Sequence, residues 1–349
     1  MEVGQRRRYG AGWWLIGALT LLISLEVGAW ERIRDSAPER YTVVEGDTLW
    51  DIAGRFLHAP WQWPDLWQAN PAIRNPHLIY PGDVLTLSDC KGAPCLSLSR
   101  GQRVVTLSPK MRAVPRREAI APIDASIIRP FLRDHRIVEG DFVEDAMAYV
   151  VAGDQGRLIS GAGDSLYVRG QVPRQEDVGI YRPADTYTAN DGTVLGTELI
   201  KIGEARYLRA EEDITQLRVI SANQEIRNND LVLPLETPRL DNDMVPRAPR
   251  NALSGSLIGV PGGVRFIGRL QVVTIDLGTL DGVQAGHVFQ IAQQGKVIND
   301  PRSQAPLTLP SEAAGTLMVF TPYDRVSYAL VMEASRVLEV GDRVRTPPR

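Results

Sequence analysis

The stretch from Tyr41 to Leu87 constrains the fold more than any other part of this 349-residue chain. Thr48 is followed three residues later by Asp51, which resembles a capping box with Asp in place of the commoner Glu or Gln. Apolar residues then recur at positions i, i+3, i+4 and i+7, the spacing of one helix face: Leu49, Ile52, Ala53 and Phe56. The pattern predicts a helix that begins just after Thr48.

Short strands and turns flank this helix. Residues 41–44 suit a strand, and Gly46-Asp47 is a turn signal. A second helix is expected over Pro64–Asn70, because Pro is accepted in a first helical turn and Pro71 prevents much continuation. Residues 81–87, PGDVLTL, read as a turn and a closing strand. The expected order is strand–helix–helix–strand around one small core.

Three motifs in combination resemble a LysM module, the small glycan-binding domain of cell-wall proteins. They are YTVVEGDTLWDIA at the front, Asn70-Pro71 after the second helix, and IYPGDVLTL at the back. The resemblance covers about 47 of the 349 residues and implies a βααβ fold. The chain departs from the short family pattern at HAPWQWP, which lengthens the connection between the helices.

The resemblance also implies a binding groove between the loop after the first strand and the loop before the last. Its ligand would be a glycan that contains N-acetylglucosamine, which in a bacterium is peptidoglycan. The alternative is a purely structural module, in which Asp47 and Thr48 serve as turn and cap and Leu49 and Ile79 belong to the core. The tryptophans are expected in the core, with Trp61 or Trp63 as alternatives at the groove. The expected glycan-binding residues are Gly46, Asp47, Thr48, Leu49, Asn75, Pro76, His77, Leu78 and Ile79.

The first residues have the pattern of a targeting segment. Arg6, Arg7 and Arg8 precede an apolar run, and Val27-Gly28-Ala29 supplies the small residues of a cleavage site. The run over residues 11–25 is short for a membrane span of about 20 residues. We expect residues 1–29 to be a cleaved signal peptide, with an uncleaved anchor as the alternative. Either exports the protein from the cytoplasm. Together with the family resemblance given below, this implies the periplasm or cell envelope of a Gram-negative bacterium.

The two cysteines agree with an oxidising compartment. Cys90 and Cys95 lie in DCKGAPC, immediately after the expected closing strand, and predict a disulfide. A loop this short gains only about 2 kcal/mol from chain entropy. Two Cys without a nearby His are too few ligands for a structural metal site, so neither a metal nor a cofactor is expected.

The rest of the chain is expected to be rich in strands. Residues 89–135 form a basic, proline-punctuated connector, either simply solvated or attracted to an anionic wall polymer or lipid. From about Arg136, short β-type runs alternate with turns, which is typical of a sandwich or small barrels. The fold class is therefore α+β: the βααβ module followed by a β-rich C-terminal region.

A weak internal repeat divides that region. Gly196-Thr197 matches Gly315-Thr316, and residues 229–232 match residues 341–344. We expect two barrel-like or sandwich-like repeats. The expected divisions are LysM 40–88, repeat 1 at 136–235, a linker at 236–262 and repeat 2 at 263–349.

No catalytic site is expected from the sequence. The four histidines are isolated, the two thiols share a tight loop, and no G-x-S-x-G elbow or P-loop is present. A pair of carboxylates for glycoside cleavage stays open, because 42 acidic residues offer many pairs. The net charge of −3 gives no nucleic-acid signature.

The whole layout is similar to the secretin-associated LysM proteins of type IV pilus systems. Two segments resemble a flagellar FlgT-type C-terminal domain: LGTELIKIGEARYLRAEEDITQLR and AGTLMVFTPYDRVSYALV. The resemblance implies a non-catalytic scaffold that binds peptidoglycan and anchors an outer-membrane secretin ring. A general peptidoglycan-binding envelope protein without a pilus partner and a peptidoglycan hydrolase are the alternatives.

Overall fold

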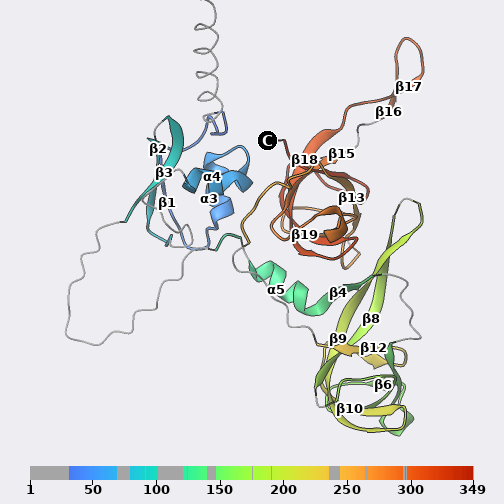
Figure 1. Cartoon of the computed structure of the whole chain (residues 1–349). Coiled ribbons are helices and arrows are strands. Elements are labelled where there is room, and N and C mark those ends of the chain that lie inside the picture. The colour runs from blue at the N-terminus through green and yellow to red at the C-terminus, as the bar shows by residue number, and fades with distance from the viewer. Residues whose placement is uncertain are drawn as a thin grey trace, which may run out of the picture. The chain divides into compact units, whose positions relative to one another are not determined.

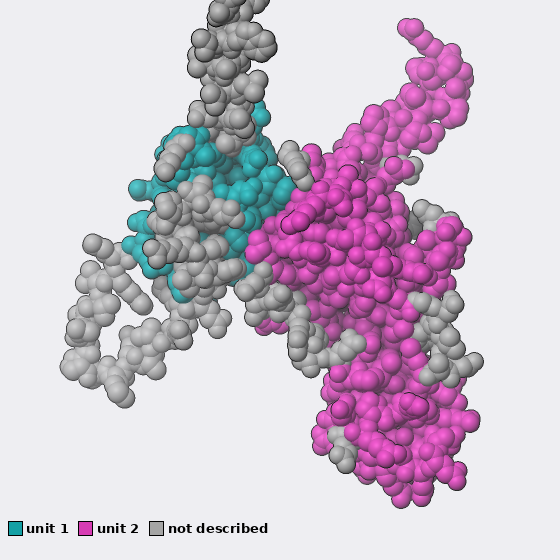
Figure 2. Space-filling view, in the orientation of Figure 1, with its two compact units in different colours: residues 1–124 teal, residues 125–349 magenta. Residues whose placement is uncertain are grey.

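The computed structural model divides the chain into two compact units, residues 1–124 and 125–349 (Figure 2). It describes residues 31–68, 79–90, 92–100, 121–123, 125–139, 147–174, 176–189, 191–235, 244–263, 266–293, 295 and 297–348. The expected signal or anchor therefore lies outside the described residues. Within the described ranges, no helix combines the length and apolar character that a membrane crossing requires.

The first unit contains the expected order of two strands around two helices. A short 3-10 turn fills the lengthened connection between the helices, and Pro60 occupies its first position. The sheet is antiparallel, with strand order β1-β2-β3. Its elements are β1 (Arg40–Thr42), α3 (Leu49–Phe56), η1 (Pro60–Gln62), α4 (Trp63–Gln68), β2 (Val84–Cys90) and β3 (Ala93–Ser99).

Strand β3 is an addition to the expected module. Residues 93–99 lie in the segment that the sequence assigned to a connector, yet they pair with β2 along its whole length, from Val84↔Ser99 to Cys90↔Ala93. A tight turn makes this possible, because Gly92 adopts a φ of +89° and its N–H donates to Asp89 Oδ1 at 2.7 Å. The module therefore extends beyond residue 88.

The predicted disulfide is present and joins the two strands of this hairpin. The Cα atoms of Cys90 and Cys95 lie 5.8 Å apart. Cys95 and Leu96 are fully buried, so β3 contributes side chains to the interior. The disulfide thus stabilises a strand that is itself part of the packed unit.

The predicted apolar face of α3 forms the interior of this unit. Its four residues, Leu49, Ile52, Ala53 and Phe56, are all buried. Trp50 and Trp63 are buried as well, as the core interpretation of the tryptophans predicts. Trp61 is only half-buried.

The second unit opens with α5 (Ala125–Asp134), which lies within the expected connector, and β4 (His135–Val138). A closed six-stranded barrel follows, with strand order β10-β7-β5-β12-β8-β9 and β4 beside β9 (Figure 1). The barrel strands are β5 (Ala148–Gly153), β7 (Ser165–Arg169), β8 (Asp177–Thr188), β9 (Val194–Glu211), β10 (Ile214–Ala222) and β12 (Leu231–Pro234). Smaller elements are η4 (Asp154–Gly156), β6 (Ile159–Ser160) and β11 (Ile226–Arg227).

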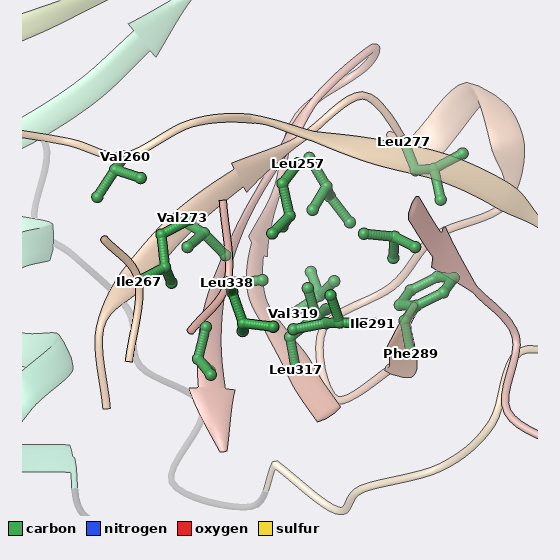
Figure 3. Close-up of a cluster of buried hydrophobic side chains, with 14 of the residues drawn as sticks. Leu257, Val260, Ile267, Val273, Leu277, Phe289, Ile291, Leu317, Val319 and Leu338 are labelled. Atoms are coloured by element: carbon green, nitrogen blue, oxygen red, sulfur yellow. The ribbon is translucent and has the colours of Figure 1, made fainter. Parts of the chain in front are cut away.

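A second closed six-stranded barrel completes the unit, with order β13-β14-β19-β18-β15-β20. Aliphatic side chains and Phe289 fill its interior (Figure 3). Its strands are β13 (Ser254–Gly259), β14 (Val272–Ile275), β15 (Val288–Gln293), β18 (Glu312–Pro322), β19 (Ser327–Ala334) and β20 (Arg343–Arg345). The 3-10 turn η5 (Thr279–Asp281) follows β14, and the hairpin of β16 (Val297–Asn299) and β17 (Pro306–Thr308) projects from the barrel (Figure 1).

The two barrels share one strand order. When the six barrel strands are counted along the chain, both close in the order 1-2-5-4-3-6. Gly196-Thr197 and Gly315-Thr316 both lie in the fourth strand. Asn229-Asp230 and Gly341-Asp342 both precede the sixth. The common order and the matched positions support duplication of one barrel.

The same aspartate turn precedes the sixth strand in each barrel. The carboxylate of Asp230 accepts from the Arg227 N–H at 2.7 Å, and that of Asp342 accepts from the Glu339 N–H at 2.9 Å. The residue before each Asp has a positive φ, +69° at Asn229 and +99° at Gly341. Asn and Gly are the residues that tolerate this conformation best, which explains their place in the repeat.

The expected linker at residues 236–262 is wrong at its C-terminal end, because β13 lies inside it. Leu257 and Val260 point into the second barrel's core (Figure 3). Strand β13 is hard to predict from the sequence because it contains Gly255 and Gly259, and Gly is depleted in strands. A side chain at Gly255 would collide with Leu277, and one at Gly259 would collide with the ring of Tyr187. Close packing, rather than loop character, explains these glycines.

A buried carboxylate links the two barrels. Glu198 in β9 is 0% exposed, and it accepts from the Tyr187 hydroxyl at 3.0 Å and from the Tyr328 hydroxyl of β19 at 3.4 Å. His135 Nδ1 lies 2.8 Å from the same carboxylate. Burial raises the pKa of both Tyr187 and Tyr328, so both remain donors. A carboxylate this deeply buried requires such partners.

We predict that the double substitution Cys90→Ser and Cys95→Ser lowers the free energy of unfolding of the first unit by about 2 kcal/mol, because the open chain regains loop entropy. Urea unfolding followed by tryptophan fluorescence measures this, since every tryptophan of the chain lies within residues 13–67. Reduction of the wild-type disulfide is the matched control and should reproduce the shift. An unchanged midpoint in both experiments would contradict the prediction.

Candidate functional site

The turn between β1 and α3 is held by one carboxylate. Asp47 Oδ2 accepts from the Val44 N–H at 2.9 Å and from the Tyr41 hydroxyl at 2.8 Å. Gly46 supplies the positive φ of the turn, +91°. Burial, followed by the interaction with Asp47, raises the pKa of Tyr41, so the phenol stays protonated and donates. Asp47 is therefore engaged in shaping the loop.

Thr48 caps the helix, as the sequence predicts. Its Oγ1 accepts from the Asp51 N–H at 3.1 Å and donates to Asp51 Oδ2 at 2.7 Å. The Asp51 carboxylate therefore accepts a hydrogen bond from the Thr48 hydroxyl group. Thr48 has extended backbone angles, φ −112° and ψ 162°, which are typical of an N-cap residue. The cap fixes the point at which α3 begins.

The first two amides of α3 have acceptors from a distant segment of the chain. The Leu49 N–H donates to the Ala121 carbonyl at 3.0 Å, and the Trp50 N–H donates to the Pro122 carbonyl at 3.2 Å. Pro122 is buried, and Ile123 is 5% exposed. These amides are among the four that a helix leaves without internal partners, so they need acceptors of this kind. We call Ala121–Ile123 the covering segment.

The turn before β2 repeats the geometry of the first turn and lies beside it. The Asp83 carboxylate accepts from the Tyr80 N–H at 3.1 Å, and Gly82 has a φ of +94°. Two backbone hydrogen bonds join this turn to the end of β1: Val43 N–H to Asp83 O at 2.9 Å and Gly82 N–H to Val43 O at 2.8 Å. The C-terminal end of the second predicted loop is thereby brought next to the first.

The structure places the predicted groove residues in different environments. Gly46 is exposed, Asp47 is half-buried, and Thr48 is 7% exposed. Leu49 and Ile79 are both 0% exposed, so these two present only backbone groups to a ligand. The remaining four, Asn75, Pro76, His77 and Leu78, lie outside the described residues. The assignment of all nine to glycan binding stays a prediction.

Sequence reasoning missed three contributors to this site. Tyr41 and Asp83 hold the two turns, and the covering segment holds the helix start. The pattern x-x-Gly-Asp at residues 44–47 and 80–83 was the available signal for the paired turns. The covering segment carries no such signal, because its contribution is made by backbone carbonyl groups, which any sequence has.

The described residues contain no candidate metal-binding site. Nowhere in those ranges do three or more His, Cys, Asp or Glu side chains gather in a way that could hold a metal ion.

Comparison with known proteins identifies the module. A family model described as the LysM domain matches residues 41–88. The chain is also similar to the uncharacterized protein YqbP of Bacillus subtilis (strain 168), with 40% identity over 67 residues. That match covers 16% of this chain and 31% of the relative, so the chain spans under a third of the relative's length. Residues 41–88 are a LysM domain.

We predict that Thr48→Val destabilises the first unit by about 1 kcal/mol, because the helix loses its N-cap acceptor. The measurement is the urea midpoint followed by tryptophan fluorescence. Thr42→Val, at an exposed position of β1, is the matched control and should stay within about 0.5 kcal/mol of wild type. Equal effects of the two substitutions would show that the cap contributes nothing specific.

Proposed function

We propose that this protein is a non-catalytic peptidoglycan-binding scaffold of the cell envelope. LysM domains bind the N-acetylglucosamine-containing glycan of peptidoglycan, and residues 41–88 of this chain are such a domain. This match is the single observation that carries the proposal. The geometry is compatible with it, because the turn before β2 is hydrogen-bonded to the end of β1, beside the turn that leads into α3.

The chemistry of the proposed ligand fits these groups. An N-acetylglucosamine unit offers hydroxyl groups and one acetamido carbonyl, which is a strong acceptor. Backbone amides at a helix N-terminus are donors with a favourable local dipole. A single small site binds such a sugar weakly. Many copies on one polymer bind strongly, because attachment of the first raises the effective concentration for the next.

We propose further that the barrels couple this attachment to an outer-membrane secretin of a type IV pilus system. The order of a targeting segment, one LysM domain and a β-rich region supports this assignment, as do the FlgT-like segments in β9–β10 and β18–β19. The projecting β16–β17 hairpin adds an exposed apolar surface suited to a protein partner. The wall would then resist pulling forces on the secretin without covalent chemistry.

Sedimentation with insoluble peptidoglycan tests glycan binding directly. We predict that the chain from residue 31 onward pellets with the wall. Gly46→Val should weaken retention by about tenfold, because a β-branched residue disfavours the φ of +91° and shifts the turn that borders the predicted groove. Gly192→Val is the matched control, since Gly192 also has a positive φ and open space around it but lies outside the LysM domain. Wild-type protein that stays in solution would contradict the proposal.

Two further measurements separate the alternatives. Crosslinking in cells followed by identification of the partner should recover a secretin; recovery of wall material alone would favour a general peptidoglycan-binding protein. Zymography on peptidoglycan should show no clearing. A cleared band would show that the chain is a hydrolase.

A further inference from the structure

The start of α3 is already occupied in this structure. The covering segment Ala121–Ile123 accepts both of the helix's first two N–H groups through its carbonyls. Leu49, the first of these donors, is one of the predicted glycan-binding residues, and its side chain is fully buried. Leu49 can therefore offer its backbone N–H to a sugar. That N–H already donates to the Ala121 carbonyl of the same chain.

The covering segment and a glycan would use the same chemistry. The segment presents the carbonyl oxygens of Ala121 and Pro122 to the amides of Leu49 and Trp50. A bound sugar would present its acetamido carbonyl to the same amides. One N–H cannot make a full-strength hydrogen bond to both at once. We propose that the covering segment is a built-in competitor of glycan, so that the LysM domain is restrained until the segment leaves. This inference rests on the proposed peptidoglycan-binding function.

The anchor of the covering segment is apolar. Ala121 is exposed, Pro122 is buried, and Ile123 is 5% exposed. Since hydrogen bonds to water replace those to the helix when the segment leaves, burial of these two side chains favours the covered state. Because the segment is part of the same chain, it competes at a high effective concentration. The apparent glycan affinity then falls in proportion to the fraction of molecules that are uncovered.

Titration of the chain from residue 31 onward with N-acetylglucosamine tetramer, followed by calorimetry, tests the proposal. Ile123→Glu removes the apolar anchor and should release the segment, so the tetramer is expected to bind about tenfold more tightly than to wild type. Hydrogen exchange of residues 48–51 in the free protein should become faster in the same variant. Replacement of residues 121–123 by Gly-Ser-Gly provides a second route to release.

Ile159→Glu is the matched control, because it makes the same change of charge at a half-exposed position of the second unit. It should bind as wild type does. Equal or weaker binding by both folded release variants, with measurable binding by wild type, would overturn the competitor while leaving glycan binding intact. Absence of binding in all variants, including wild type, would overturn the proposed function itself.

Discussion

The proposed site in the first unit depends on how the N-terminus of α3 finds acceptors for its backbone amides. Thr48 satisfies the Asp51 N–H, and the carbonyls of Ala121 and Pro122 satisfy the two before it. This requirement sets where the helix begins and brings a distant piece of chain to its first turn. The same amides are the donors that we propose for the glycan, so the first turn of α3 serves both the fold and the proposed binding.

Local patterns were enough to predict the module. Thr48, Asp51 and the apolar face of α3 lie within nine residues, so capping and amphipathic spacing determine them without help from the rest of the chain. The disulfide was equally local, because Cys90 and Cys95 are close in sequence. The covering segment was missed because it is defined by contacts with distant backbone, which leave little trace in side-chain choice. Strand β3 was missed although its hairpin with β2 is local, because it follows the point where the family pattern ends.

In the second unit too, local sequence patterns predicted some features and missed others. The matched landmarks predicted two β-rich repeats, because Asn229-Asp230 and Gly341-Asp342 form a turn that demands particular residues. The expected C-terminal end of the linker was wrong, because Gly255 and Gly259 in strand β13 are required by close packing against Leu277 and Tyr187. A glycine chosen for a tight approach and a glycine in a linker look alike in sequence. Only the closed barrel distinguishes them.

The most direct measurement is a titration of the isotope-labelled chain with N-acetylglucosamine tetramer, followed through the amide resonances of Leu49 and Trp50. If glycan and covering segment compete at this helix start, both resonances shift along the titration, and the amide resonances of Ala121 and Ile123 shift in step. Saturable binding that leaves Leu49 and Trp50 unmoved would place the sugar elsewhere and contradict the account.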